Sequence, residues 1–254
     1  HVRSRRQRQM CIRDSASPAV VGGERITCGG RSGVVTRDFA PASELANDPA
    51  LVAVERCGMV EGVHHGRVAV TAADGSPLTA LGAVEVPMYP RSAVKPLQAI
   101  AMLRNGLDLD GELLALAAAS HDGEPFHVDG VRQILEGCGL TEEDLQNPAE
   151  FPLSDRARVD WIREHGDPAP VAMNCSGKHA AMLRTCVRSK WDRASYLAPE
   201  HPLQTAVFDA IAEFAGEDVA HVAVDGCGAP LVAISLAGLA PVSYTHLRAH
   251  ETPE

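Results

Sequence analysis

The sequence lacks features that would place it in several common classes of protein. No apolar run reaches the roughly 18 residues that cross a bilayer, which argues against a helical membrane protein. Acidic residues outnumber basic ones, and the net charge of −10 argues against a nucleic-acid binder that relies on overall charge. The seven cysteines show no disulfide framework and nothing signals secretion, which favours a reduced, cytoplasmic setting.

The basic charge that is present gathers at the N-terminus. Residues 1–15 carry five arginines and at face value form a basic arm or a targeting peptide, without the apolar stretch of a secretory signal. However, residues 10–15 can be encoded by a DNA sequence whose complementary strand encodes residues 242–246. This DNA sequence looks like the transposon end that is used to build sequencing libraries. We therefore expect residues 1–15 and 242–254 to be adapter-derived.

The remaining chain divides into a leader and one domain. Residues 16–47 form an uncertain leader, whose Gly, Ser and Arg-rich beginning fits either read-through or a genuine flexible N-terminus. We expect residues 48–241 to be the domain itself, truncated at its C-terminal side. The hydrophobic fraction of 45% is sufficient for a packed core.

The order of periodic segments predicts an α+β (mixed α/β) fold. Strands are expected at 51–54, 67–71 and 80–86, with a hairpin turn at Asp74-Gly75. Helices are expected at 92–105, 111–119, 124–137, 178–189 and 201–215, a further helix start at Thr141, and a strand at 221–224. The nearly all-apolar helix at 111–119 should be buried. This order indicates an antiparallel sheet combined with a helical half.

The string 90–96 contains Ser92 and Lys95 in the spacing Ser-x-x-Lys. If Ser92 opens a helix, Lys95 lies one turn on and on the same face. A desolvated, neutral lysine can take the proton of a serine hydroxyl and so activate it as a nucleophile. The alternative is an N-cap serine followed by a solvated lysine.

A second polar string, Ser120-His121-Asp122-Gly123-Glu124, interrupts two apolar helices. A Ser/His/Asp nucleophilic set is one interpretation, although the members of such triads are normally brought together by folding. The other is a capped helix junction, in which Asp122 and Glu124 favour the start of the next helix.

Cys175 and Cys227 each lie in a glycine-containing polar turn. Two such turns can place two thiolates on one metal ion, form a disulfide, or supply a nucleophile beside His179. A purely structural role stays open, because zinc usually takes four ligands. The cysteines at 57, 138 and 186 have the character of ordinary small core or surface residues.

Taken together, four strings in this order resemble the thermolabile, zinc-containing L-asparaginase II family. They are residues 91–98, 120–125, 174–179 and 225–230, and the resemblance covers roughly 48–241. It implies a β-lactamase-like fold of the serine–lysine type, incomplete here at its C-terminus. It also implies an amidohydrolase that converts L-asparagine to L-aspartate and ammonia.

The resemblance implies catalytic roles for three residues. Ser92 and Lys95 match one Ser–Lys tandem, with Ser92 as the nucleophile. Ser120 matches the serine of a second tandem and is the competing nucleophile. The lysine of that second tandem lies beyond Pro241 in the family and is absent from this chain.

The resemblance also implies a bound Zn²⁺ and a substrate-binding set. The residues that match zinc ligands are Cys175, Lys178 and Cys227, and a lysine ligand requires a neutral amine. Arg91 matches an arginine that pairs with the substrate carboxylate. Asp225 matches a residue near the metal and the substrate's amino end, and His121 is added to the substrate-binding set.

Two other functions stay open at this point. A different acyl-serine hydrolase, of β-lactamase or transpeptidase type, accounts for Ser-x-x-Lys but not for the two cysteine turns. A truncated zinc-binding fragment that catalyses nothing is the non-enzymatic alternative. The expected partner is small-molecule L-asparagine, with no nucleic acid and no membrane, and a homodimer stays open.

Overall fold

A computed structural model describes residues 48–245, with side chains up to Val242. The segments predicted to be adapter-derived (1–15) and leader (16–47) lie outside the described residues, as do residues 246–254. Helix α9 (Leu236–Thr245) continues into the segment expected to be adapter-derived, and the Val242 side chain is 2% exposed.

The described strands form three antiparallel pairs. They are β1 (Ala50–Arg56) with β2 (Met59–His65), β3 (Val68–Thr71) with β4 (Pro77–Leu81), and β5 (His221–Val224) with β6 (Pro230–Ala233). The hairpin predicted at Asp74-Gly75 is confirmed, with Gly75 at φ +83°. The strand predicted at 80–86 is wrong in its bounds, because β4 ends at Leu81 and Gly82 turns the chain at φ +74°.

Seven α-helices lie within the described residues, and with the antiparallel strands they confirm the mixed α/β class. They are α3 (Lys95–Arg104), α4 (Gly111–Ala117), α5 (Pro125–Glu136), α6 (Asp155–His165), α7 (Ser176–Ser189), α8 (Pro202–Ala215) and α9. None of the helices between residues 48 and 245 is long and apolar enough to span a bilayer.

Some helical predictions need correction. Helix α4 is only partly buried: Leu116 and Ala117 lie in the core, whereas Ala115 is exposed. Thr141 does cap a helical segment, but this is a single 3-10 turn that ends at Asp144. Helix α6 was not predicted, because only two of its side chains are buried.

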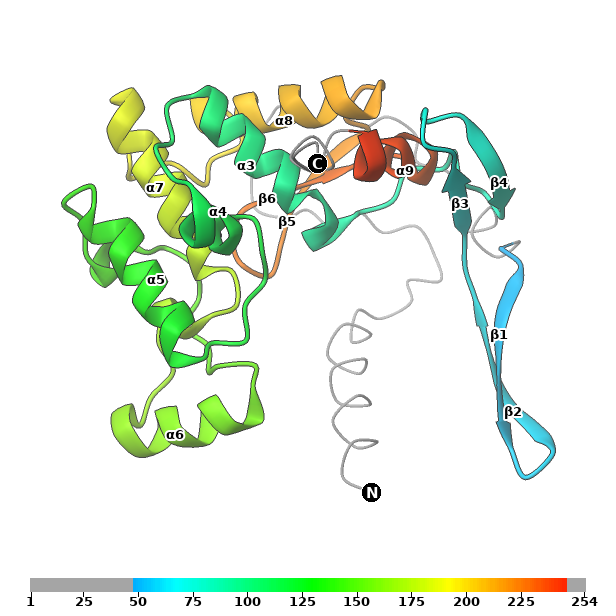
Figure 1. Cartoon of the computed structure of the whole chain (residues 1–254), viewed down its shortest axis with the longest axis horizontal. Helices are drawn as coiled ribbons and strands as arrows, with labels where there is room; N and C mark the ends of the chain where they lie inside the picture. The colour runs from blue at the N-terminus through cyan, green and yellow to red at the C-terminus, as the bar shows by residue number, and fades with distance from the viewer. Residues whose placement is uncertain (1–47, 246–254) are drawn as a thin grey trace, which may run out of the picture. The chain divides into compact units, whose positions relative to one another are not determined.

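Helix α7 is the central element of the helical half. It packs against α3, α4, α5 and α8 (Figure 1), and every side chain from Ser176 to Cys186 is buried. Gly177 permits this packing, since a Cβ there would lie 2.7 Å from the carbonyl oxygen of Leu116 in α4. The close approach brings the loop after α4 beside the start of α7.

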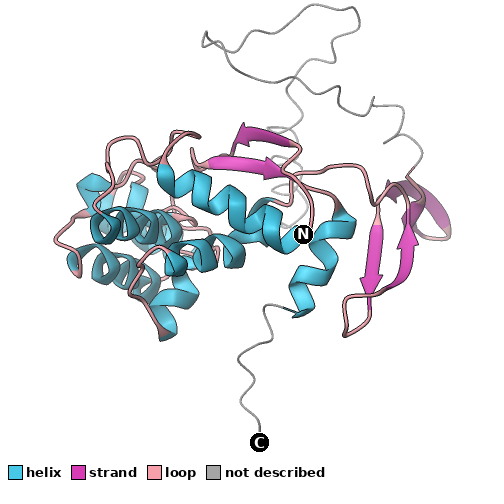
Figure 2. Cartoon of the chain, turned by 90° about the horizontal axis from the view of Figure 1, so that it is seen from above, coloured by secondary structure: helices cyan, strands magenta, loops and turns pink. Residues whose placement is uncertain are grey.

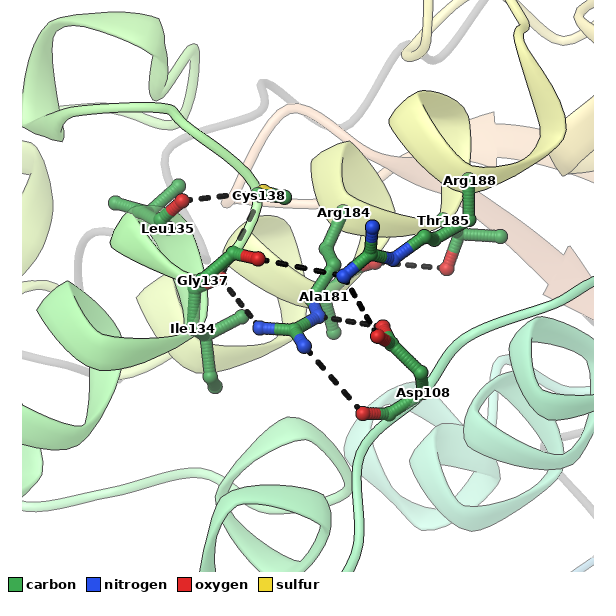
Figure 3. Close-up of polar contacts among 9 residues, drawn as sticks. All are labelled: Asp108, Ile134, Leu135, Gly137, Cys138, Ala181, Arg184, Thr185 and Arg188. Carbon is green, nitrogen blue, oxygen red and sulfur yellow. Dashed lines mark hydrogen bonds and ion pairs between the residues drawn. The ribbon is translucent and has the colours of Figure 1, made fainter.

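An ion-pair cluster ties α7 to its neighbours away from that end (Figure 3). Arg184 and Arg188 of α7 each reach one carboxylate oxygen of Asp108 at 2.7 Å. Arg184 also donates to the carbonyl oxygen of Ile134, and Arg188 to that of Gly137. The two arginines therefore connect α7 with α5 and with the segment between α3 and α4.

A second apolar core joins α3, α8, α9 and β6. Figure 2 shows the β5–β6 ribbon beside these helices. Its buried residues include Leu97 of α3, Ile211 of α8, Val232 of β6 and Leu239 of α9. This packing holds the β5–β6 turn, which carries Asp225 and Cys227, against the helical half.

Candidate active site

A chain of hydrogen bonds connects an exposed serine to a buried lysine. Lys95, the first residue of α3, donates from Nζ to Ser120 Oγ and to the Ala119 carbonyl oxygen, both at 2.7 Å. The Ser120 hydroxyl donates in turn to Ser92 Oγ at 3.2 Å. Both serines are exposed, whereas Lys95 is 3% exposed. The hydroxyls therefore face solvent above a sequestered amine.

This geometry differs from the expected Ser92–Lys95 pairing. The hydrogen bonds connect Lys95 with Ser120, and they reach Ser92 through Ser120. Ser92 lies in a 3-10 turn (Arg91–Val94), and α3 begins only at Lys95. The Ser-x-x-Lys spacing relates only Ser92 and Lys95. It could not indicate that Ser120, from the loop after α4, lies between them.

Burial shifts Lys95 toward its neutral form. Desolvation lowers its pKa, and the neighbouring Cys175 opposes that effect. A lowered pKa increases the fraction of neutral amine, and only the neutral amine can accept a proton.

Arg91 and Asp225 place opposite charges next to the serines. Arg91 directly precedes Ser92, and its guanidinium lies 2.8 Å from the Asp225 carboxylate. Arg91 has φ +52°, in the left-handed region that non-glycine residues rarely adopt. Such strained positions concentrate at functional sites. The pair thus presents a cation and an anion at the edge of the hydroxyl chain.

Cys175, Lys178 and Cys227 form a second cluster, here called the sulfur–amine group. Lys178 Nζ donates to Cys227 Sγ at 3.2 Å, and all three residues are at most 6% exposed. A hydrogen bond from Cys175, with further contributions from His179 and Lys178, lowers the pKa of the Cys227 thiol. The pKa of Cys175 is raised correspondingly. The cluster therefore favours one thiolate.

The donor chemistry of the sulfur–amine group fits a thiophilic metal ion. Two sulfurs and one nitrogen are the donor types that zinc prefers in proteins. Across residues 48–245, no three side chains of the His, Cys, Asp or Glu type gather into a metal site, and a metal ion bound here would take Lys178 as its third donor. Nearby, Nε2 of the fully buried His179 has no hydrogen-bond partner.

His121 joins the two clusters. Its backbone N–H donates to the Asn174 carbonyl at 3.0 Å, and its Nε2 lies 2.8 Å from Ser176 Oγ. Because the Ser176 hydroxyl proton goes to the Val171 carbonyl, His121 must donate from Nε2. Its Nδ1 accepts from Gly123 N, and burial lowers its pKa to about 4. Both ring nitrogens are engaged within the protein, and contact with substrate stays a prediction.

A comparison with models of protein families identifies the family of the chain. The family model for L-asparaginase II matches residues 52–254. The chain belongs to the L-asparaginase II family. Membership supports an asparaginase-type hydrolase that acts on amides of small molecules. A search of curated proteins finds no match.

In this L-asparaginase II protein, the structure bears on two roles that the sequence left open for the cysteines, a disulfide and a nucleophile. All five cysteines of the described residues are free thiols. Cys175 and Cys227 are 6% and 2% exposed, so neither can meet a substrate as the Ser92 and Ser120 hydroxyls can. Cys186 is buried in α7, and burial raises its pKa to about 12.

One residue near the site was not indicated by any sequence motif. Tyr196 is fully buried, and its hydroxyl lies 2.8 Å from His179 Nδ1. The signal that could have indicated it is the group of large apolar residues Trp191, Tyr196 and Leu197 in the connection between α7 and α8, which suggests a buried connection.

Proposed function

We propose that the chain is an L-asparaginase that uses a serine nucleophile and a lysine base. The observation that carries this proposal is the hydrogen-bond chain from exposed Ser92 through Ser120 to buried Lys95. Family membership supplies the amide-hydrolase class, and the hydrogen bonds supply a route for the proton.

The proposed reaction begins with proton transfer away from Ser92. Once Lys95 is neutral, the Ser120 hydroxyl turns to donate to Lys95 Nζ and the Ser92 hydroxyl donates to Ser120 Oγ, which reverses the directions of the two hydrogen bonds in the structure. Lys95 then takes the proton of Ser120 while Ser120 takes that of Ser92, and Ser92 Oγ attacks the side-chain amide carbon. The proton returns to the leaving nitrogen, the C–N bond breaks and ammonia departs, which leaves an ester on Ser92. Water, deprotonated by the same lysine, then hydrolyses this ester to L-aspartate and restores Ser92.

The Arg91–Asp225 pair supports a free amino acid as the substrate. An α-amino acid carries one carboxylate and one ammonium group, which complement the guanidinium and the carboxylate respectively. We therefore expect amides without an α-ammonium group to be hydrolysed more slowly than L-asparagine.

The proposal includes zinc held by Cys175, Lys178 and Cys227. When bound, the ion supplies a positive charge and fixes the β5–β6 turn to the start of α7. Free thiols among the described cysteines fit the reducing cytoplasmic setting that we propose for the protein.

The test measures ammonia release from L-asparagine by the purified chain. Ser92→Ala should lower turnover by about three orders of magnitude or more, and Ser76→Ala, in the β3–β4 turn, is the matched control. Mass spectrometry of quenched reactions should find the acyl group on Ser92. An acyl group on Ser120, with near-normal turnover of Ser92→Ala, would reverse the two roles.

Two further outcomes separate the remaining alternatives. Faster hydrolysis of a chromogenic β-lactam than of L-asparagine would favour the β-lactamase type of hydrolase. Zinc binding without release of ammonia from any amide would favour the non-catalytic fragment.

A further inference from the structure

A cavity of about 370 Å³ lies between the start of α5 and α6. No residue of the Ser92–Ser120–Lys95 hydrogen-bond chain or of the sulfur–amine group lines it. Helix α6, below α5 in Figure 1, buries only the side chains of Ala157 and Trp161, and both line the cavity. The volume falls within the range of about 300–1,000 Å³ that small-molecule sites occupy. The cavity is therefore large enough for a small ligand.

The walls of the cavity carry more acidic than basic side chains. The carboxylates are those of Glu124, Asp129, Asp160 and Glu164, and the guanidinium groups are those of Arg132 and Arg156. Both arginines already have carboxylate neighbours within the protein. Arg132 lies 3.3 Å from Asp129 and 2.6 Å from Glu142. Arg156 lies 4.0 Å from Asp160. The charge that remains unmatched on the walls is therefore negative.

Two of these carboxylates, Glu124 and Glu164, are without partners. Across residues 48–245, neither side chain forms a hydrogen bond or an ion pair. Glu124 is the N-cap residue of α5 and is half-buried, yet it makes no capping hydrogen bond. Glu164 lies on α6, which forms the opposite wall. The two carboxylates thus leave acceptor oxygens free on both walls of the cavity.

An aromatic side chain adjoins these carboxylates. Trp161 is 8% exposed, and its Nε1–H donates to the carbonyl oxygen of Asp167 at 2.9 Å, which fixes the indole. The ring of His165, which also lines the cavity, stacks on the indole at 4.1 Å between centroids. Aromatic rings attract ammonium groups, and apolar surface packs against alkyl chains. Acidic walls beside an indole therefore favour a ligand that is both cationic and partly apolar.

We propose that the cavity between α5 and α6 binds a small organic cation, an aliphatic amine whose charge pairs with Glu124 and Glu164 and whose carbon chain packs against Trp161. A bare metal ion fits less well, because no three His, Cys, Asp or Glu side chains of the described residues gather closely enough to hold one. The proposal is independent of the asparaginase reaction, because binding is measured without turnover.

The cavity also borders the loop that follows Ser120. Gly123 lines the cavity and donates its N–H to His121 Nδ1 at 3.2 Å. The Asp122 carbonyl accepts from the N–H of Ser154, the N-cap residue of α6, at 3.0 Å. An amine that bridges α5 and α6 should therefore slow the exchange of amide hydrogens both in the loop 121–124 and in α6.

Fluorescence of Trp161 provides the first measurement. The chain has two tryptophans, so Trp191→Phe leaves Trp161 as the sole emitter. Titration with putrescine in about 150 mM salt should change this emission saturably, with a Kd of about 1 mM or tighter. The uncharged diol with the same carbon chain should leave the emission unchanged. No saturation by putrescine up to about 10 mM, or equal binding of the diol, would overturn the proposal.

Paired variants test the two carboxylates by isothermal titration calorimetry. Glu124→Gln combined with Glu164→Gln retains the shape of both side chains and removes their charges, so putrescine binding should weaken by about tenfold or more. Glu136→Gln, exposed near the other end of α5, should stay within about twofold and is the matched control. Glu164→Gln alone carries the test if the double variant does not fold, since Glu164 is exposed. Equal affinities in the cavity variants and in Glu136→Gln would overturn the site.

Hydrogen–deuterium exchange then locates the bound amine. Peptides that cover the loop 121–124 and α6 should exchange more slowly when putrescine is present, and the double variant should lose this protection. Protection confined to other parts of the chain would place the amine elsewhere and overturn the proposal.

Discussion

Lys95 and Lys178 occupy the same place in two short motifs but enter different environments. Lys95 follows Ser92 by three residues, and Lys178 follows Cys175 by the same spacing. Both amines are buried, at 3% and 2% exposure. Lys95 donates to oxygen atoms below two exposed hydroxyls, whereas Lys178 donates to a sulfur within a closed cluster.

Under the roles proposed for the two lysines, solvent access and bonding partner, rather than spacing, separate a catalytic base from a metal ligand. A proton acceptor for catalysis must connect to a group that substrate can reach, as Lys95 does through Ser120. A metal donor benefits from soft neighbours and the exclusion of water, as at Lys178.

The largest expected effect comes from Lys95→Met. The substitution retains the bulk of the buried stem and removes the base, so asparagine turnover should fall by about three orders of magnitude or more. Zinc affinity should change much less than turnover, although Lys95 neighbours Cys175, because Lys178 is the proposed lysine ligand. Loss of zinc with retained turnover would contradict the division between the two lysines.

The next effect concerns His121, which connects the two clusters. Its folded pKa of about 4 lies below the ordinary value of 6.5, so the unfolded chain binds the proton more readily. Stability is therefore complete above pH 6.5 and declines as pH falls toward about 4, by at most about 3 kcal/mol.

Urea unfolding across that pH range measures the decline. His121→Gln retains a donor toward Ser176 and removes the titrating ring, so its stability should change less over the same range. His64→Gln is the control. An equally steep profile in His121→Gln would show that another group causes the decline.

A smaller effect is expected from Lys178→Met. Zinc affinity should fall by about 100-fold, because one of three donors is lost. Any loss of turnover should be partly reversed by added zinc, whereas the loss in Lys95→Met should not. Chelator competition and ammonia release measured on the same samples give both quantities. Turnover that zinc cannot restore would assign Lys178 a direct part in catalysis.

The smallest effect lies outside both clusters, in the contacts of Asp108 with α7 (Figure 3). The hydrogen bonds of Arg184 and Arg188 hold the pKa of Asp108 well below its usual range. The ion pairs therefore stabilise the fold above about pH 4, and this contribution is lost as pH falls further.

Asp108→Asn should destabilise the chain by about 1–2 kcal/mol at neutral pH, because the mostly buried Arg184 loses its charged partner. Urea unfolding is the measurement, and Asp160→Asn, which affects only exposed ion pairs on α6, is the control. Unchanged metal affinity would show that this end of α7 is separate from the sulfur–amine group.

Much of the secondary structure could be predicted because it depends on local pattern. Apolar spacing predicted α3, α5 and α8 to within a few residues, and the β-branched strand β5 with its observed bounds. Strand β6 and helix α9 were missed, because their apolar character is continuous rather than periodic. A β-lactamase-like arrangement of the whole stays a prediction.

Residue types and their spacing by themselves determined the family, the mixed α/β class and the strings that carry Ser92, Lys95, Cys175 and Cys227. Only the tertiary structure decided which of these side chains meet. Ser120 lies between Ser92 and Lys95 because Gly177 allows α7 to approach α4 closely, and His121 then fixes the following loop to the start of α7. Tyr196 reaches His179 through packing between distant segments, which short-range periodicity does not encode.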